Sequence, residues 1–174
     1  MSRFKVICKV MEVIKAGIKD IATIQQLAKT IWPIAYKEII SNNQLEFMLE
    51  LIYSTAALQA QIAKGHQFIL AVENEVPIGF ASFSQKNNEE PQTYRLHKIY
   101  VLPEYPTKGI GSLLLSHILS TCIEAGASKL ELNVNKYNTA IQFYLKKGFT
   151  TLKEEVIDIG EGYVMDDYVM ILPL

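Results

Sequence analysis

The chain has 174 residues, enough for one sizeable domain with a single core. Hydrophobic residues make up 49 % of it and charged residues 20 %, a balance that is typical of globular proteins and argues against disorder. The net charge of −1 disfavours a nucleic-acid-binding protein, which needs clustered Lys and Arg. No apolar run approaches about 18 residues, and the charged N-terminal segment is unlike a signal peptide, so the sequence predicts a cytoplasmic protein with no membrane partner.

Hydrophobic periodicity divides the chain into runs typical of strands and runs typical of helices. Asp20 can cap the first helix, Pro33 is expected to end it, and Gly65 and Gly148 end two others. The predicted strands are residues 13–16, 67–73, 78–85, 94–102, 129–135, 151–159 and 163–172. The predicted helices are residues 20–32, 43–53, 54–65 and 139–147, with one more that opens at a glycine-bearing turn near residue 109.

This order of elements predicts an α/β domain built on a central mixed sheet. The strand–helix–strand unit from residue 94 to 135 should be a right-handed parallel crossover. The hairpins on either side make the rest of the sheet antiparallel, and helices are expected on both of its faces. No internal repeat, linker or low-complexity tract divides the chain. Residues 12–174 are therefore predicted to form one domain after an N-terminal extension at residues 1–11.

The most informative segment runs from Ile99 to Ser112, where a β-branched strand enters a helix through a turn that holds Gly109 and Gly111. Unpaired backbone N–H groups at the positive end of a helix form a ready site for a phosphate or pyrophosphate. Glycine lets the backbone approach such an anion closely, although glycines at these junctions also serve packing alone. The two common phosphate motifs fit poorly, because residue 114 is Leu where a Rossmann fingerprint needs Gly, and P-loop spacing is absent.

The turn Pro106-Thr107-Lys108-Gly109-Ile110-Gly111 resembles the Q/R-x-x-G-x-G/A motif of the GNAT superfamily of N-acetyltransferases, which holds the pyrophosphate of acetyl-CoA. Both glycines match. Pro106 stands where Gln or Arg is usual and has no N–H, which predicts a weaker or redistributed grip on the anion. The resemblance implies acetyl-CoA as the cofactor, bound by Thr107, Lys108, Gly109, Ile110, Gly111 and Ser112.

A second segment resembles the family motif N-x-x-A-x-x-x-Y-x-x-x-G-F through Asn138, Ala140 (one place off the commonest spacing), Tyr144, Gly148 and Phe149. In the family this tyrosine lies near the sulfur of CoA and is the usual candidate acid for the leaving thiolate. Tyr144 is therefore implied to be catalytic and to contact the cofactor, with an aromatic packing role as the alternative. Asn138, together with Asn135, is implied to hold the pantetheine arm.

The strand before the glycine turn supplies the remaining implied contacts. Ile99, Tyr100 and Val101 resemble the family strand whose backbone pairs with pantetheine and polarises the thioester carbonyl. His97 lies on the same strand, and the ordinary pKa of histidine suits a base near neutrality. His97 is therefore a candidate catalytic base, with a surface or core-edge histidine as the alternative.

The acceptor site is expected between the segment 33–42 and the last hairpin, residues 160–168. Tyr36, Glu38, Asp166 and Asp167 are the candidate substrate-binding residues, and Glu161 adds another acid. Acids there would attract a cationic amine, although they could also be a solvated surface. The strand 96–103 is similar to that of bacterial polyamine-type enzymes. A small primary amine such as a polyamine is thus predicted, with a protein or peptide N-terminus as the alternative acceptor.

Other features predict no metal and no disulfide framework. The three histidines are scattered, and neither cysteine has metal-ligand spacing. Cys122 falls on the apolar stripe of its helix and is expected to be a buried structural thiol. The family resemblance extends from about residue 12 to the end and allows a homodimer. A non-catalytic acyl-CoA sensor is the alternative to an enzyme, and the presence of Tyr144 argues against it.

Overall fold

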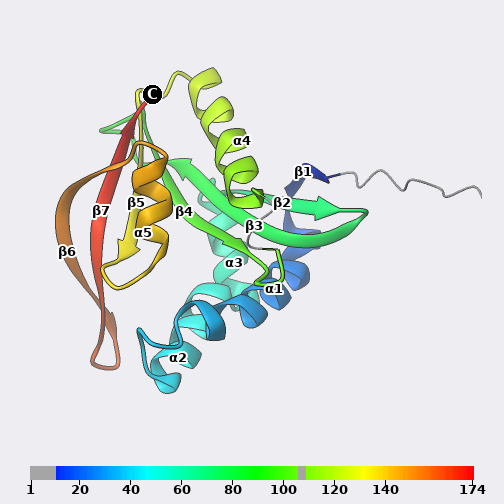
Figure 1. The fold of residues 1–174 in the computed structure, drawn as a ribbon, viewed down its shortest axis with the longest axis vertical. Helices are drawn as coiled ribbons and strands as arrows, with labels where there is room; N and C mark the ends of the chain where they lie inside the picture. The colour runs from blue at the N-terminus through cyan, green and yellow to red at the C-terminus, as the bar shows by residue number, and fades with distance from the viewer. Residues whose placement is uncertain (1–10, 106–108) are drawn as a thin grey trace, which may run out of the picture.

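The structure is a computed structural model that describes residues 11–105 and 109–174. Its strands form one seven-stranded sheet in the order β1-β2-β3-β4-β5-β7-β6. The strands are β1 (Met11–Ala16), β2 (Gln67–Glu73), β3 (Val76–Gln85), β4 (Thr93–Val101), β5 (Lys129–Asn135), β6 (Thr150–Gly160) and β7 (Tyr163–Pro173). All neighbours are antiparallel except β4 and β5, which are parallel. The predicted mixed sheet and parallel unit are confirmed (Figure 1).

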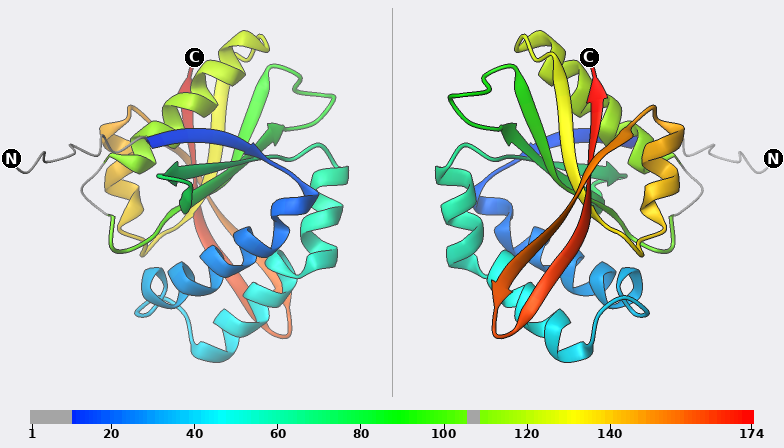
Figure 2. Two further views of the ribbon diagram at one scale, coloured as in Figure 1. Left: turned by 90° about the vertical axis from the view of Figure 1, so that its right-hand side faces the viewer. Right: turned by 90° about the vertical axis from the view of Figure 1, so that its left-hand side faces the viewer.

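Helices cover both faces of the sheet, as predicted (Figure 2). The helices are η1 (Ile18–Asp20), α1 (Ile21–Ala35), α2 (Asn42–Tyr53), α3 (Thr55–Ala63), α4 (Ile110–Glu124) and α5 (Ala140–Lys146). The first three α-helices pack on one face, and α4 and α5 pack on the other. Alternation along β2 serves both cores, because Phe68 and Leu70 face α1–α3 while Ile69 faces α4.

Cys122 lies in the core beneath α4, as the sequence predicts. Its side chain is fully buried, and burial raises the pKa of the thiol to about 12. A thiol with so high a pKa is not ionised near neutrality and behaves as a small apolar group.

Two predictions about α1 are wrong. The helix does not end at Pro33 but continues to Ala35, because the Tyr36 N–H donates to the Trp32 carbonyl at 3.0 Å and completes the last turn. Asp20 precedes α1, yet its side chain does not cap that helix. Its Oδ2 instead accepts a 2.9 Å hydrogen bond from the backbone N–H of Gly17, which stabilises the short turn of η1.

A β-bulge at His97 shapes the sheet. Ser82 of β3 pairs with Lys98 and Phe83 pairs with Leu96, so His97 is an extra residue in β4. A bulge bends its strand and increases the local twist. On the other side of β4, the ladder with β5 ends at the same point, at the pair Leu96–Leu132. Beyond it the two strands lie apart, which opens a wedge in the sheet (Figure 1).

Candidate active site

A cavity of about 390 Å³ occupies this wedge. Its walls come from α1, α2, β4, β5, α5 and β7. The β6–β7 hairpin closes one side by packing on α2: Gln44 Nε2 donates to the Val164 carbonyl at 3.0 Å, and the Phe47 and Tyr163 rings lie 5.4 Å apart. The segment after α1 and the last hairpin therefore meet at one cavity, where the sequence predicts the acceptor.

Aromatic side chains line the α1 side of the cavity. The Tyr36 and Tyr100 hydroxyls are 2.9 Å apart, and the Trp32 ring lies 4.7 Å from that of Tyr36. Burial is the main cause that raises the pKa of both Tyr36 and Tyr100. Both phenols are therefore protonated near neutrality and present O–H groups and ring faces to a ligand.

Tyr144 lies on α5 and lines the cavity, and only 7 % of the residue is exposed. Its ring packs edge-on against Phe149 with centroids 5.5 Å apart. Burial, reinforced by Tyr36, raises the pKa of the Tyr144 phenol above its ordinary value. The structure thus gives Tyr144 a packing contact and also keeps a proton on its oxygen beside the cavity.

The two asparagines of the second motif line the cavity as well. Asn138 Oδ1 accepts from the Ala140 N–H at 2.8 Å, which gives the first N–H group of α5 a partner. Asn135 Oδ1 accepts from the Tyr137 N–H at 3.0 Å. Their side-chain oxygens fix the loop between β5 and α5, so any contact that they donate to a ligand would come from Nδ2.

Of the glycine turn, the described residues 109–112 do not line the cavity. Thr107 and Lys108 fall outside the described residues, as does Pro106. Gly109 precedes α4 with a φ of +70°, the left-handed region that glycine adopts readily. Ser112 lies in the first turn of α4, where backbone N–H groups have no partner within a helix.

The predicted acidic residues separate in the structure. Asp167 is 6 % exposed and lines the cavity, whereas Glu38 is exposed and does not. Asp166 is bound by Lys136 at 2.6 Å. Successive residues of a strand point to opposite faces, so Asp166 and Asp167 serve different surfaces. Burial, followed by repulsion from Asp166 and Glu155, raises the pKa of Asp167 to about 6, although the Asn133 amide opposes this rise.

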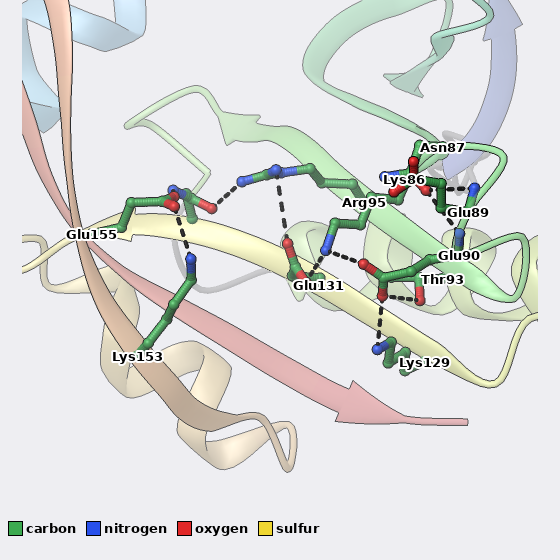
Figure 3. Close-up of polar contacts among 11 residues, drawn as sticks. Lys86, Asn87, Glu89, Glu90, Thr93, Arg95, Lys129, Glu131, Lys153 and Glu155 are labelled. Carbon is green, nitrogen blue, oxygen red and sulfur yellow. Dashed lines mark hydrogen bonds and ion pairs between the residues drawn. The ribbon is translucent and has the colours of Figure 1, made fainter.

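A polar network connects β4, β5 and β6 (Figure 3), and three of its members, Asn133, Glu155 and Arg95, act on Asp167. Arg95 donates to Asn133 Oδ1 and lies 3.7 Å from Glu131. Asn133 Nδ2 donates to Glu155 at 3.0 Å, and Glu155 also accepts from Lys153 at 2.9 Å. The network fixes the Asn133 amide at the edge of the cavity.

His97 does not have the predicted near-neutral pKa. Its Nε2 is 2.8 Å from Ser84 Oγ, and its ring stacks on that of His66 with centroids 3.9 Å apart, so these two histidines are not scattered. Burial, followed by His66 and Lys98, lowers the pKa of His97 to about 3. A ring with so low a pKa takes up a proton from an amine poorly near neutrality.

Lys98 and Asn133 are cavity residues that the sequence analysis missed. Lys98 is 7 % exposed, its Nζ donates to Gln61 at 2.6 Å, and burial lowers its pKa to about 8. The bulge places Lys98 and His97 on the same side of β4, near α3, and no local pattern in the sequence predicts this placement. Asn133 could have been found from alternation, since it shares a strand face with Asn135.

The stacked histidines predict acid sensitivity. Their folded pKa values, about 4 for His66 and about 3 for His97, lie below the ordinary 6.5, so each ring is protonated in the unfolded chain first. Stability should fall as the pH drops below about 6.5, by at most about 1.4 kcal/mol per pH unit for each ring. Denaturant unfolding of His97→Gln should show a smaller loss between about pH 6.5 and 4 than the wild type. An equal loss in His97→Gln would contradict this origin, and His117→Gln is the control.

Comparison with known proteins identifies the class. Residues 35–165 match the family model described as an acetyltransferase (GNAT) domain, so the chain belongs to this family. It is an acetyl-CoA-dependent N-acetyltransferase, as the sequence resemblance implies. No helix in residues 11–105 and 109–174 has the length and apolar character needed to cross a membrane. The same described residues contain no group of His, Cys, Asp or Glu suited to a metal ion.

Individual relatives cover almost the whole chain. A spermidine N(1)-acetyltransferase of Thermoplasma acidophilum is 28 % identical over 162 residues, 90 % of this chain and 96 % of the relative. The crystal structure of PaiA N-acetyltransferase of the same organism with coenzyme A has a TM-score of 0.80 at 24 % identity, covering 95 % and 99 % of the two chains. The acetyltransferase yncA of Salmonella typhimurium, solved with acetyl-CoA, has a TM-score of 0.68 at 23 % identity, covering 95 % and 94 %.

Proposed function

We propose that the chain transfers the acetyl group of acetyl-CoA to a primary amine of a small cationic molecule, for example a polyamine, and that Tyr144 is the general acid. The observation that carries the proposal is the cavity between β4 and β5, which Tyr144, Asp167 and strand residues 99–101 all line. A buried carboxylate and aromatic ring faces favour a cationic ligand. The spermidine acetyltransferase among the relatives supports the same acceptor class.

The charges in the cavity suggest how the amine lies. Asp167 is on β7, whereas the ammonium of Lys98 is held on the α3 side by Gln61. Like charges repel, so the positive end of the acceptor is placed toward Asp167 and away from Lys98. The reacting nitrogen then approaches the thioester from the β7 side of the wedge.

The reaction needs a polarised carbonyl and a proton for the leaving sulfur. We propose that backbone N–H groups of residues 99–101 polarise the thioester carbonyl. The amine forms the C–N bond, the C–S bond breaks with its electron pair passing to sulfur, and the Tyr144 phenol gives sulfur its proton. The surplus proton on nitrogen then restores the phenol. A phenol whose pKa is raised keeps its proton until the thiolate forms.

The test is release of free thiol from acetyl-CoA with spermidine, free amino acids and peptides with a free N-terminus. We expect spermidine to give the highest kcat/KM and a decrease with added salt, because salt screens the attraction to Asp167. Fastest turnover of a peptide would instead support an N-terminal acceptor. Binding of acetyl-CoA without thiol release from any amine would support a sensor.

Cofactor binding should depend on the turn before α4. Gly109→Val forces a β-branched residue into the left-handed region, which costs about 1–2 kcal/mol or moves the turn. We expect acetyl-CoA to raise the Tm of the wild type by linkage and to leave that of Gly109→Val unchanged. Gly111→Leu should act similarly, because a Cβ there already lies 3.6 Å from the Phe143 ring. Exposed Ser116→Ala on α4 is the control, and a normal Tm rise in Gly109→Val would contradict the site.

A further inference from the structure

Asp167 is distinguished from its acidic neighbours by what surrounds it. Glu131 is paired with Lys86 at 3.1 Å, Glu155 with Lys153 at 2.9 Å, and Asp166 with Lys136 at 2.6 Å. Within residues 11–105 and 109–174, Asp167 is the buried acid of this sheet face with no such ion pair. Arg95 attracts Asp167 from a distance but forms no ion pair with it. A buried carboxylate without an ion pair is costly, so it points to a bound group that supplies a cation.

The cavity lets a cationic ligand reach Asp167. Asp167 lies opposite Asn135 in the β5–β7 pairing, and both line the cavity with Tyr36 and Tyr144. The charge of Asp167 acts on the Tyr36 phenol from the neighbouring wall. The carboxylate therefore lies beside the space that the proposed acceptor would fill.

We propose that Asp167 is the catalytic base, which takes a proton from the ammonium of the acceptor and so creates the neutral amine that attacks the thioester. This rests on the proposed function. The N–H bond breaks, its electron pair stays on nitrogen as the attacking lone pair, and the proton binds a carboxylate oxygen of Asp167. After transfer, the carboxylic acid returns this proton to solvent. The phenol of Tyr144 supplies the separate proton that sulfur needs.

The alternatives in the cavity are less suited. His97 is engaged by Ser84 and stacked on His66, and its pKa of about 3 makes it a weak base. Lys98 donates to Gln61, and its ammonium has no lone pair to accept a proton. Asp167 faces Glu155, Asn133 and Arg95 from β6, β5 and β4, and Tyr36 from the residue after α1. The charge of its neighbour Asp166 on β7 also acts on it. Burial raises its pKa and, together with the effects of these groups, brings it to about 6, a value at which a carboxylate can accept a proton and release it near neutrality.

The pH dependence of kcat/KM tests the assignment. The wild type should lose activity on the acidic side with a midpoint near pH 6. Asp167→Asn should be about 10²–10⁴-fold slower near neutrality, and its rate should rise about tenfold per pH unit as the free amine accumulates without a base. Glu124→Gln, an exposed acid at the end of α4, is the control and should keep the wild-type profile.

Stability provides a second readout that does not need turnover. A carboxyl group whose folded pKa lies above its ordinary 3.8 favours folding when protonated and opposes it when charged. Asp167→Asn should therefore have a higher Tm than the wild type near pH 8, and the difference should vanish near pH 4. A lower Tm near pH 8 would contradict the unpaired, desolvated carboxylate.

The outcomes separate this proposal from the proposed function. An unchanged acidic limb in Asp167→Asn, or a higher KM for the amine with unchanged kcat, overturns the base role while acetyl transfer stands. A wild type that releases no thiol with any amine overturns both. Loss of the midpoint near pH 6 in Asp167→Asn, which leaves the continuous rise of the rate with pH, supports the assignment when Glu124→Gln keeps that midpoint.

Discussion

Replacing Tyr144 with Phe should lower kcat by about 10²–10⁴-fold, the usual contribution of a general acid. The phenol is the group that would protonate the departing thiolate, and the substitution removes only its oxygen. The Tyr144 ring would still pack on Phe143 and Phe149, at centroid distances of 5.4 and 5.5 Å, so the Tm should change little. Affinity for acetyl-CoA, measured by its effect on Tm, should also be nearly unchanged.

The chain offers a matched control for this substitution. Tyr137 lies in the same β5–α5 region but is 73 % exposed and does not line the cavity, so Tyr137→Phe should keep the wild-type kcat. An unchanged kcat in Tyr144→Phe would leave the residue with only its packing role. A large decrease in both kcat and Tm would point to lost packing rather than lost acid.

Gly79→Ala should destabilise the fold and disturb the site at once. Gly79 pairs with Val101 across β3 and β4, and a Cβ there would lie 2.8 Å from the Tyr100 carbonyl oxygen and 3.3 Å from Val101 Cα. Both neighbours are backbone atoms and cannot rotate away. Such overpacking typically costs roughly 1–3 kcal/mol, and about 2–4 °C of Tm per kcal/mol is expected for a chain of this size. Moving β4 also displaces the cavity wall, so kcat should fall too.

Gly17→Ala is the control for this prediction. A Cβ at Gly17 meets nothing within 4 Å, and its φ of −143° suits any residue. Thermal unfolding should place Gly17→Ala near the wild type and Gly79→Ala well below it. Equal Tm values for the two variants would mean that β3 and β4 separate slightly at little cost.

Local signals in the sequence predicted most of the fold. The helix that begins after Gly109 and the helix between Asn138 and Gly148 each follow a signal for a helix start and carry a periodic apolar stripe. The structure has α4 and α5 close to the predicted bounds. The prediction that the helix ends at Pro33 is wrong because a proline in the last turn removes only one hydrogen bond. The following hydrogen bond, from the Tyr36 N–H to the Trp32 carbonyl, still forms.

The cavity was less predictable, because its members meet only after folding. Tyr36, Tyr144 and Asp167 come from three separate elements, and each was found through the family resemblance or through acidity rather than through contact. Asp166 and Asp167 appear equivalent in composition, and only alternation along β7 separates the ion-paired surface acid from the cavity acid. The low pKa of His97 arises from burial and from His66, which no local pattern encodes.

The extra residue in β4 has a consequence for how this site could be lost or gained. Lys98 and Leu96 already pair with the adjacent residues Ser82 and Phe83, so deleting His97 would leave a regular ladder between β3 and β4 and keep the later side chains on their present faces. Tyr100 would stay on the side of α1–α3, and Ile99 and Val101 would stay on the side of α4. Without the bulge, β4 would bend less away from β5, and the β4–β5 ladder could extend past the pair Leu96–Leu132. Deleting this one codon would thus close the wedge between β4 and β5 that holds the cavity, while every other residue of the chain stayed the same.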